Sequence, residues 1–256
     1  MAYVDGMSEL ARNALSLPEP WPTTIEDARA VQERMRGLVR LEPLADLPKL
    51  VAGIDVGLLQ DGLVRAAVAV LDFPALTLVE SALAIQPAAF PYVPGFLSFR
   101  EIPPVLEALG KLNALPGLLV CDGQGIAHPR GFGIASHLGV LTGLPSLGVA
   151  KSRLVGRYAE PGSERGSRSP LVYRSRQVGW VLRTRTSVKP VFVSPGHRLD
   201  LYGSLELAMA LAPKYRLPET TRQAHNLASG HRPRSIKPES DTEEVDKGRR
   251  HSNSGV

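Results

Sequence analysis

The chain has 256 residues, of which 43% are hydrophobic and 21% are charged, as in a globular protein with a sizeable buried core. The net charge of +5 is compatible with a polyanionic partner, and a single cysteine, Cys121, excludes an intramolecular disulfide framework. The N-terminus lacks the layout of a signal peptide and no apolar run reaches the length of a membrane span, so we expect a soluble, cytoplasmic protein without a membrane partner.

The first part of the chain predicts one helix followed by three strands. Thr23, with Glu26 three residues later, has the spacing of a helix start, and the apolar stripe after it predicts a helix near 24–40. Apolar segments separated by turn-forming residues then predict strands over 49–59, 63–73 and 76–86. Their hairpin-like spacing indicates an antiparallel meander.

From residue 102 the hydrophobic period changes. We predict helices over 102–112, 132–143 and 201–212, and strands over 117–122, 145–151, 177–184 and 189–196. Strand–helix–strand alternation with short connections implies parallel pairing, whereas the last two strands resemble a hairpin. Three antiparallel strands followed by parallel strands, with helices packed on a mixed sheet, are the α/β layout of the ribonuclease-H-like superfamily.

Two segments differ from these elements. Residues 158–176 are rich in Arg and Ser and are expected to form a surface insertion or a loop that faces nucleic acid. Residues 229–256 contain three aliphatic residues among dense charge, which is too few to offset the entropy of ordering. We therefore expect a single domain over 1–228 and a disordered, charged tail over 229–256.

The stretch FPYVPGFLSFRE, residues 90–101, combines large apolar side chains with residues that interrupt helix and strand geometry, Pro91, Pro94 and Gly95. We expect a loop here, with the three phenylalanines mostly in the core. The stretch ends in Glu101, which precedes or opens the next helix.

Three carboxylates lie at the ends of predicted elements. Asp55 lies within an apolar strand, where an unpaired carboxylate is costly and needs a partner or a metal ion. Asp122 ends the strand over 117–122 and can approach Asp55 if the two strands are neighbours. Together with Glu101 they offer the oxygen ligands that Mg²⁺ or Mn²⁺ prefers, and these ions support phosphodiester cleavage. Asp122 could instead be a turn residue, and Ser98 with Glu101 could form a capping box.

The segment DGQGIAHPRGFGIASHLG, residues 122–139, is the densest in glycine and polar side chains. Gly123 and Gly125 allow the backbone to approach a ligand closely. His128 and Arg130 precede a predicted helix, and a helix N-terminus suits phosphate. His137 lies within the helix itself and is expected to be a packed structural residue.

Three further polar residues come later in the chain. Lys151 ends the strand over 145–151, beside the expected place of Asp122, where it would contact phosphate, assist proton transfer or simply lie on the surface. Arg222 and His225 are three residues apart, and by themselves they indicate a solvated helix face.

Taken together, several segments closely resemble the endonuclease V family of deoxyinosine 3′-endonucleases, over roughly residues 25–228 and in the family's order. These segments are PYVPGFLSFRE, DGQGIAHPR with GIASHLGV, LPSLGVAKSRLVG, KPVFVSPGHR and LPETTRQAH. The resemblance implies a ribonuclease-H-like fold and Mg²⁺-dependent nicking, with Mn²⁺ as a substitute, at the second phosphodiester bond 3′ to deoxyinosine. The products would carry 3′-hydroxyl and 5′-phosphate ends. Gly131-Phe132 departs from the further basic residue that relatives commonly carry there.

The resemblance implies metal-coordinating acids, a catalytic lysine and a catalytic histidine, which are Asp55, Glu101, Asp122, Lys151 and His225. It also implies a wedge that separates the DNA strands, formed by Pro91, Tyr92, Val93 and Pro94, with Tyr92 facing DNA. Further contacts with nucleic acid are expected from Gly123, Gly125, His128, Arg130 and Arg222.

The implied substrate is DNA that contains deoxyinosine or other deaminated bases, cut by a monomer, and inosine-containing RNA stays open as a further substrate. Two other classes of function also stay open. One is another ribonuclease-H-like nuclease, of the junction-resolvase or RNase H type, and the wedge and the His-Pro-Arg motif argue against it. The other is a non-catalytic nucleic-acid-binding module, and the complete set of acids argues against it.

Overall fold

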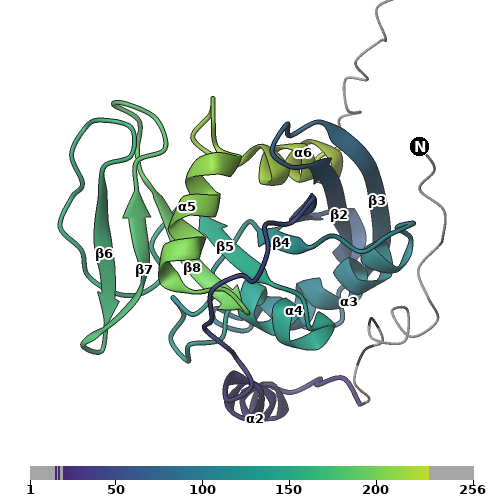
Figure 1. Cartoon of the computed structure of the whole chain (residues 1–256). Coiled ribbons are helices and arrows are strands. Elements are labelled where there is room, and N and C mark those ends of the chain that lie inside the picture. The colour runs from purple at the N-terminus through teal and green to yellow at the C-terminus, as the bar shows by residue number, and fades with distance from the viewer. Residues whose placement is uncertain (1–14, 16, 18–19, 231–256) are drawn as a thin grey trace, which may run out of the picture.

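The structure of the protein, a computed structural model, describes residues 15, 17 and 20–230. Its elements are α2 (Ile25–Arg36), β1 (Leu50–Leu58), the short 3₁₀ turn η1 (Gln60–Gly62), β2 (Leu63–Asp72), β3 (Leu78–Pro87), α3 (Leu97–Gly110), β4 (Leu118–Cys121), α4 (Ile134–Thr142), β5 (Ser146–Ala150), β6 (Arg168–Tyr173), β7 (Arg176–Leu182), β8 (Val191–His197), α5 (Leu201–Leu211) and α6 (Glu219–Ala228). The strands form one sheet in the order β3-β2-β1-β4-β5-β8-β7-β6 (Figure 1).

The pairings of the sheet confirm the predicted layout. β1 pairs antiparallel with β2, and β2 with β3, whereas β1–β4 and β4–β5 are parallel. β8, β7 and β6 continue the sheet beyond β5 in antiparallel fashion. Ile54 lies opposite Cys121 as the last pair of the β1–β4 ladder, so Asp55 and Asp122 follow the end of this ladder at the same level, although β1 itself continues to Leu58 beside β2.

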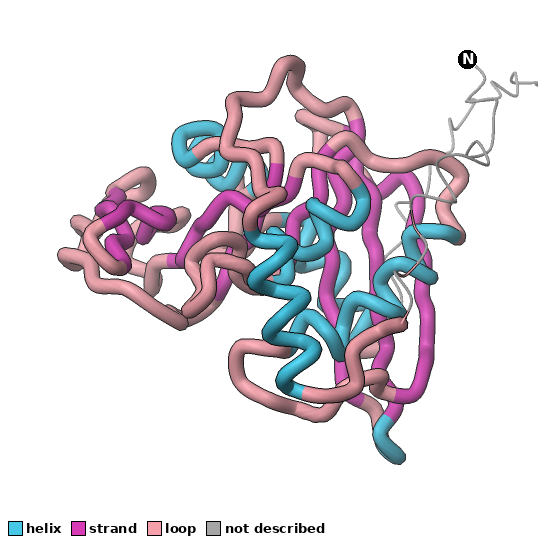
Figure 2. The backbone as a smooth tube through the Cα atoms, turned by 90° about the horizontal axis from the view of Figure 1, so that it is seen from below, coloured by secondary structure: helices cyan, strands magenta, loops and turns pink. Residues whose placement is uncertain are grey.

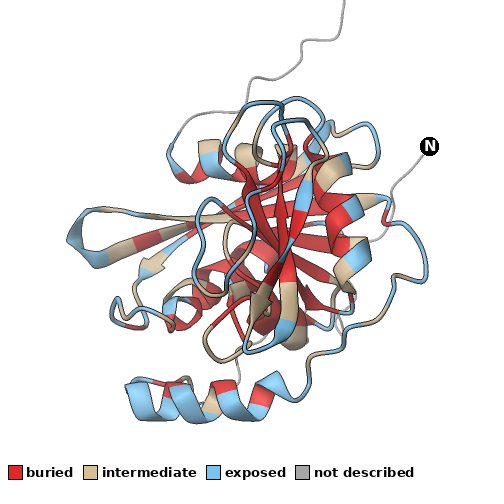
Figure 3. Cartoon of the chain, turned by 90° about the vertical axis from the view of Figure 1, so that its left-hand side faces the viewer, coloured by how far each residue is buried: buried red, intermediate tan, exposed pale blue. Residues whose placement is uncertain are grey.

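Helices cover both faces of this sheet (Figure 1). Side chains alternate between the faces along β1, so that Ala52 and Ile54 pack with α3 and α4, whereas Val51 packs with α5 and α6. The strands between these layers are buried, while α2 is mostly exposed (Figure 3). The core therefore lies on both sides of the strands that carry the candidate acids.

Two glycines of β1 let α6 pack directly on the strand. A Cβ added at Gly53 would lie 1.9 Å from the carbonyl oxygen of Thr220, and one at Gly57 would lie 3.1 Å from that of Ala228. Residues 53, 55 and 57 share one face of β1 because side chains alternate along a strand. Asp55 therefore lies between the two glycines, beneath α6.

The predicted start of the first helix is wrong by one residue. Thr24 is the N-cap, and its hydroxyl oxygen accepts a hydrogen bond from the Asp27 amide at 3.1 Å. The same Thr-x-x-acid spacing that Thr23 and Glu26 display recurs one position later, and the observed cap uses the later copy. The helix ends at Arg36, with Gly37 as its C-cap, so the expected end near residue 40 is also wrong.

The prediction of a loop through residue 101 is wrong for its last five residues, because α3 begins at Leu97. Pro103 and Pro104 lie inside the helix and supply no amide hydrogen to the preceding turn. The carbonyl of Phe99, four residues before Pro103, accepts a hydrogen bond from Trp21 Nε1 at 3.0 Å instead. This contact from outside the helix compensates for one of the missing bonds.

The segment 158–176 is predicted to be a surface insertion or a loop that faces nucleic acid, and the loop alternative is wrong for its second half, which contains β6. This strand pairs with β7 and forms the edge of the sheet. Arg168 and Pro170 are exposed, whereas Ser169 and Leu171 are buried. The alternation includes a proline and a buried serine, so its apolar signal is too weak to indicate a strand.

None of the helices within the described residues is long and apolar enough to cross a membrane. The expected tail falls almost entirely on residues 231–256, which lie outside the described residues. The division into a domain over 1–228 and a tail therefore stays a prediction.

Candidate active site

Two of the predicted acids meet basic side chains at the carboxyl end of the paired segment of β1 and β4. Asp55 Oδ2 lies 2.7 Å from Nδ1 of His225 on α6. Asp122 Oδ2 lies 2.5 Å from Nζ of Lys151, which directly follows β5. Parallel strands bring their carboxyl ends to one edge of the sheet, and close packing of α6 on β1 brings the histidine to the same edge. Four predicted catalytic residues are thus assembled there.

Glu101 reaches this edge from α3, on the opposite face of the sheet. Burial raises the pKa of its carboxyl to about 8, and the negative charges of Asp55 and Asp122 contribute to this rise. Burial also raises the pKa of Asp122, against the lowering effect of its bond to Lys151. Glu101 and Asp122 also line the same cavity, so the carboxyl of Glu101 lies close to the two acids of the strands.

The donor set fits a divalent cation in its chemistry. Carboxylate oxygens are the ligands that Mg²⁺ and Mn²⁺ prefer. Burial, and to a lesser extent the charges of Asp55 and Asp122, raise the pKa of Glu101, and a bound cation would oppose both effects. Within residues 20–230 no three His, Cys, Asp or Glu side chains are already gathered as a metal-binding group. Asp55 and Asp122 instead face His225 and Lys151. The metal-ligand roles of the acids therefore stay a prediction.

A cavity of about 200 Å³ lies directly beside the acids. Its walls come from the 90–101 stretch, from the segment after β4 and from the start of α4, and include Tyr92, Pro94, Ser98, Glu101, Asp122 and Gly123. Two predicted nucleic-acid-binding segments, around Pro94 and around Gly123, thus line one pocket together with two of the acids.

The segment that carries the predicted wedge projects one aromatic side chain outward. Tyr92 is 66% exposed, whereas Phe90, Phe96 and Phe99 are buried, which confirms that the phenylalanines belong to the core. Pro91 and Pro94 are exposed and Val93 is half-buried. The buried phenylalanines pack against one another, with ring centroids 5.7–6.4 Å apart, and anchor the loop from below.

Arg130 holds in place the loop over residues 90–96, named here the wedge loop because it carries the predicted wedge residues. Its Nη2 donates to the carbonyl oxygen of Gly95 at 2.6 Å, its Nε donates to Gln32 Oε1, and its guanidinium lies 4.1 Å from the centroid of the Phe96 ring. Gln32 Nε2 donates to the same Gly95 carbonyl at 2.9 Å. Arg130 therefore acts on the loop in this structure, and a direct phosphate contact stays a prediction.

His128 lies behind this loop and lines the cavity. Burial lowers the pKa of its imidazole to about 4, and the neighbouring Arg130 guanidinium contributes to this lowering. His128 is therefore uncharged near neutral pH and would meet a ligand as a neutral hydrogen-bonding group.

Gly125 and Arg222 lie elsewhere than in the cavity wall. The Gly125 amide donates to Ser194 Oγ at 2.8 Å, and a Cβ at Gly125 would lie 2.0 Å from the Pro195 carbonyl oxygen, so this glycine lets its loop pack on β8. Arg222 bonds Glu219 at 2.9 Å and stacks 3.7 Å from the centroid of the Tyr215 ring, one turn of α6 before the predicted catalytic histidine.

His137 is a packed structural residue, as predicted. Its ring is fully buried, with centroids 4.9 Å from Phe99 and 5.0 Å from Phe132, and burial lowers its pKa to about 3. Its Nδ1 lies 3.1 Å from Oγ of Ser98, which lines the cavity. The histidine therefore supports the cavity wall from behind.

Arg216 is a site residue that sequence reasoning missed. Its Nη2 donates to the carbonyl oxygens of Lys151 at 2.7 Å and Pro190 at 2.9 Å, and its Nε donates to that of Lys189 at 2.8 Å. It thereby holds the end of β5, from which Lys151 projects. No local pattern in YRLPE could have indicated this, because all three acceptors are backbone groups distant in sequence.

Known proteins match both the sequence and the fold. A family model described as Endonuclease V matches residues 33–226. An endonuclease V from Nostoc punctiforme is 55% identical over 211 residues, which cover 82% of this chain and 96% of the relative. The crystal structure of the Streptomyces avermitilis endonuclease V has a TM-score of 0.80 at 52% identity and covers 84% of this chain and 95% of that chain.

A more distant match carries a nucleic acid. Endonuclease V from Ciona intestinalis was solved in complex with a 24mer DNA containing an inosine followed by a ribo-adenosine. It has a TM-score of 0.70 at 26% identity and covers 80% of this chain and 96% of that chain. The family match over most of the chain and the shared fold show that this protein belongs to the endonuclease V family and is therefore a nuclease.

Proposed function

We propose that the protein is a Mg²⁺-dependent DNA repair endonuclease. It nicks the second phosphodiester bond 3′ to deoxyinosine and leaves 3′-hydroxyl and 5′-phosphate ends. The observation that carries this proposal is the cavity beside the acids, whose rim bears the exposed Tyr92. The DNA with an inosine bound by the Ciona intestinalis relative supports the choice of substrate.

Lesion recognition would depend on the cavity and its rim. Tyr92 would occupy the space left in the base stack, while the deaminated base turns into the cavity between the Pro94 and Gly123 walls. Arg130 would keep the loop rigid during this step, because its contacts to Gly95 are already made in the free protein. Weak pairing of the deaminated base lowers the cost of flipping it.

Phosphodiester hydrolysis would take place at the edge where the acids meet. Asp55, Glu101 and Asp122 would hold the cation, which supplies Lewis-acid stabilisation of the phosphate and its leaving 3′-oxygen. Lys151 would neutralise phosphate charge with an ammonium group that Asp122 holds in place. The Asp55 carboxylate, 2.7 Å from Nδ1, would orient the ring of His225 so that its Nε2 can position the attacking water.

The direct test is nicking of an end-labelled duplex with one inosine, in Mg²⁺. Wild-type protein should cut one strand at the second bond 3′ to the inosine, and Asp55→Ala should lose this activity while staying folded by circular dichroism. Asp46→Ala, at an exposed position, is the matched control and should cut normally. Two results would refute the proposal: nicking by Asp55→Ala at the rate of the wild-type protein, or cleavage by the wild-type protein at a different bond.

The same assay with other substrates distinguishes the proposed function from the two alternative classes of function. Preferential cutting of a four-way junction or an RNA–DNA hybrid would favour another ribonuclease-H-like nuclease, and binding without cutting at any Mg²⁺ or Mn²⁺ concentration would favour a binding module. Cleavage of inosine-containing RNA of the same sequence tests whether RNA is a second substrate. A monomer and a cytoplasmic location stay predictions, which size-exclusion chromatography and cell fractionation would test.

A further inference from the structure

The positive charge of the chain is concentrated in one segment. Residues 151–189, named here the basic wing, contain ten Lys or Arg and two Glu, a net charge of +8. The whole chain carries +5, so all remaining residues together carry −3. Eight of the ten basic residues are Arg, whose planar guanidinium matches phosphate better than the ammonium of Lys.

The wing begins at the candidate active site, reaches the edge of the sheet at β6 and returns to Lys189, whose carbonyl oxygen is bound by the same Arg216 that binds that of Lys151. It starts with Lys151, passes Leu154 in the cavity wall, and pairs Arg157 with Val172 of β6. The β6–β7 hairpin then follows, and it projects at the left of the molecule in both Figure 1 and Figure 2. The wing therefore connects the wall of the cavity with the edge strand of the sheet.

Most of this charge is exposed and uncompensated. Within the described residues, ion pairs with carboxylates involve Lys151 and Arg183 of the wing, but none of the other eight basic residues. These eight are exposed, and they are Arg153, Arg157, Arg165, Arg168, Arg174, Arg176, Arg185 and Lys189. A cluster of like charges costs free energy in the folded protein unless a polyanion neutralises it.

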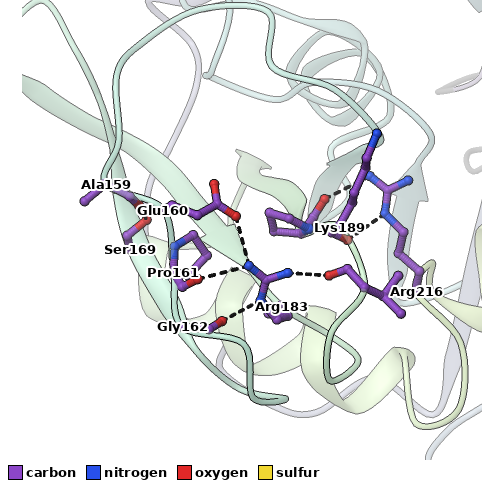
Figure 4. Close-up of polar contacts among 10 residues, drawn as sticks. Ala159, Glu160, Pro161, Gly162, Ser169, Arg183, Lys189 and Arg216 are labelled. Atoms are coloured by element: carbon purple, nitrogen blue, oxygen red, sulfur yellow. Dashed lines mark hydrogen bonds and ion pairs between the residues drawn. The ribbon is translucent and has the colours of Figure 1, made fainter.

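Arg183 is buried and serves as the anchor of the wing (Figure 4). Its Nη2 donates to Glu160 Oε1 at 2.9 Å and to the Pro161 carbonyl oxygen at 3.0 Å, and its other nitrogens donate to the carbonyls of Gly162 and Val188. Glu160, one of the two carboxylates of the wing, is thus paired with the buried Arg183 and not with an exposed arginine. Arg183 therefore fixes the loop that precedes β6 and the loop that follows β7 without a bound ligand.

Edge protection explains part of this pattern. Exposed charges and proline on an edge strand prevent pairing with another chain, and Arg168 and Pro170 of β6 fit that role. It does not explain Arg153, Arg157 or Arg185, which lie outside β6.

We propose that the basic wing binds the phosphate backbone of duplex DNA beyond the nicking site, independently of sequence. The choice of DNA as the polyanion rests on the proposed function. Duplex is favoured over single strands because the wing offers no exposed aromatic platform for stacked bases: Tyr158, Tyr173 and Trp180 are partly or fully buried. The wing would lengthen the footprint on DNA and raise affinity for damaged and undamaged sites alike.

The test measures binding of an undamaged duplex of about 24 base pairs, long enough to reach past a single contact site, as a function of salt concentration. Two wing variants, Arg153→Gln with Arg157→Gln and Arg174→Gln with Arg176→Gln, are compared with wild type. The control pair, Arg34→Gln with Arg36→Gln on exposed positions of α2, removes the same net charge. The slope of log K against log salt should become shallower by about 0.9 for each phosphate that is no longer neutralised, hence by about 1.8 in a wing variant and not in the control.

The two proposals fail in different measurements. Wild-type slopes in both folded wing variants, or equal changes in the wing and control pairs, overturn the wing proposal even if wild-type protein nicks inosine duplex. A slope change that appears with single-stranded DNA or duplex RNA but not with duplex DNA also overturns it. Conversely, a shallower slope on duplex DNA supports the wing even if inosine nicking is absent.

Discussion

Replacing Glu101 by Gln separates the electrostatic cost of the acid cluster from its catalytic role. The folded-state pKa of Glu101 is about 8, against an ordinary value of 4.5, because the carboxyl is buried beside Asp55 and Asp122. Between these two pH values the folded protein keeps a proton that the unfolded chain has released. Stability must therefore fall as the pH rises from about 4.5, and the fall levels out above about 8.

The loss of stability caused by Glu101 is measured best between about pH 6.5 and pH 8. Below about pH 6.5 the buried His128 and His137, with lowered pKa values of about 4 and 3, act in the opposite direction, since stability then rises with pH. Above this pH both histidines are neutral in the folded protein and lose their remaining protons in the unfolded chain, and this contribution is the same in wild type and in Glu101→Gln, so the comparison of the two removes it. One pH unit of titration is worth at most about 1.4 kcal/mol, and the slope halves as the pH reaches the pKa of Glu101, so wild type should lose about 1.6 kcal/mol across this window relative to Glu101→Gln.

Urea unfolding in metal-free buffer at several pH values supplies the assay. Glu107→Gln is the control on the same helix: this glutamate is exposed, and its bond to Lys111 lowers its pKa, so its titration ends well below the window. The control should keep the wild-type slope, and Glu101→Gln should flatten it. Equal pH slopes for wild type and Glu101→Gln would refute the claim that Glu101 is held protonated by its surroundings.

Three further changes probe the surroundings of the acids. Tyr92→Ala should change the free energy of unfolding by at most about 0.5 kcal/mol, because the side chain is exposed. In binding titrations it should reduce the preference for inosine-containing over undamaged duplex, and an unchanged preference would contradict the wedge role. Arg130→Ala should cost about 1–3 kcal/mol in urea unfolding because the wedge loop loses a charged donor, and no cost would contradict that anchoring role. Gly53→Ala should cost about 1–3 kcal/mol because its methyl group would meet the Thr220 carbonyl; Gly110→Ala, with nothing within 4 Å, is the control and should not destabilise.

Two of the acids could be placed from sequence because their signals are local. Apolar residues on both sides of Asp55, and before Asp122, define their strands, and the short connection through α4 makes β4 and β5 parallel. The alternation and pairing rules do not say that β1 and β4 are neighbours, because β2, β3 and α3 separate them in the chain; that pairing is expected only from the ribonuclease-H-like layout. The resemblance to a known family added the substrate and the identity of the wedge, which those rules do not contain.

The partner of Asp55 could not be placed in the same way. Arg222 and His225 have the spacing of an exposed helix face, and His225 reaches Asp55 only because α6 packs on Gly53. The two residues are separated by 170 positions in the chain. No pattern within a few residues of either one records that contact.

The sequence by itself determined most of the strands and helices, with β6 as an exception, and the residue types available for chemistry. Tertiary structure decided that Arg130 anchors the wedge loop, that Arg216 holds the end of β5 and that Glu101 keeps its proton to about pH 8. The physical reason is range. Hydrophobic period and turn chemistry act over a few residues, whereas hydrogen-bond partners and pKa values depend on which distant groups share one poorly solvated space.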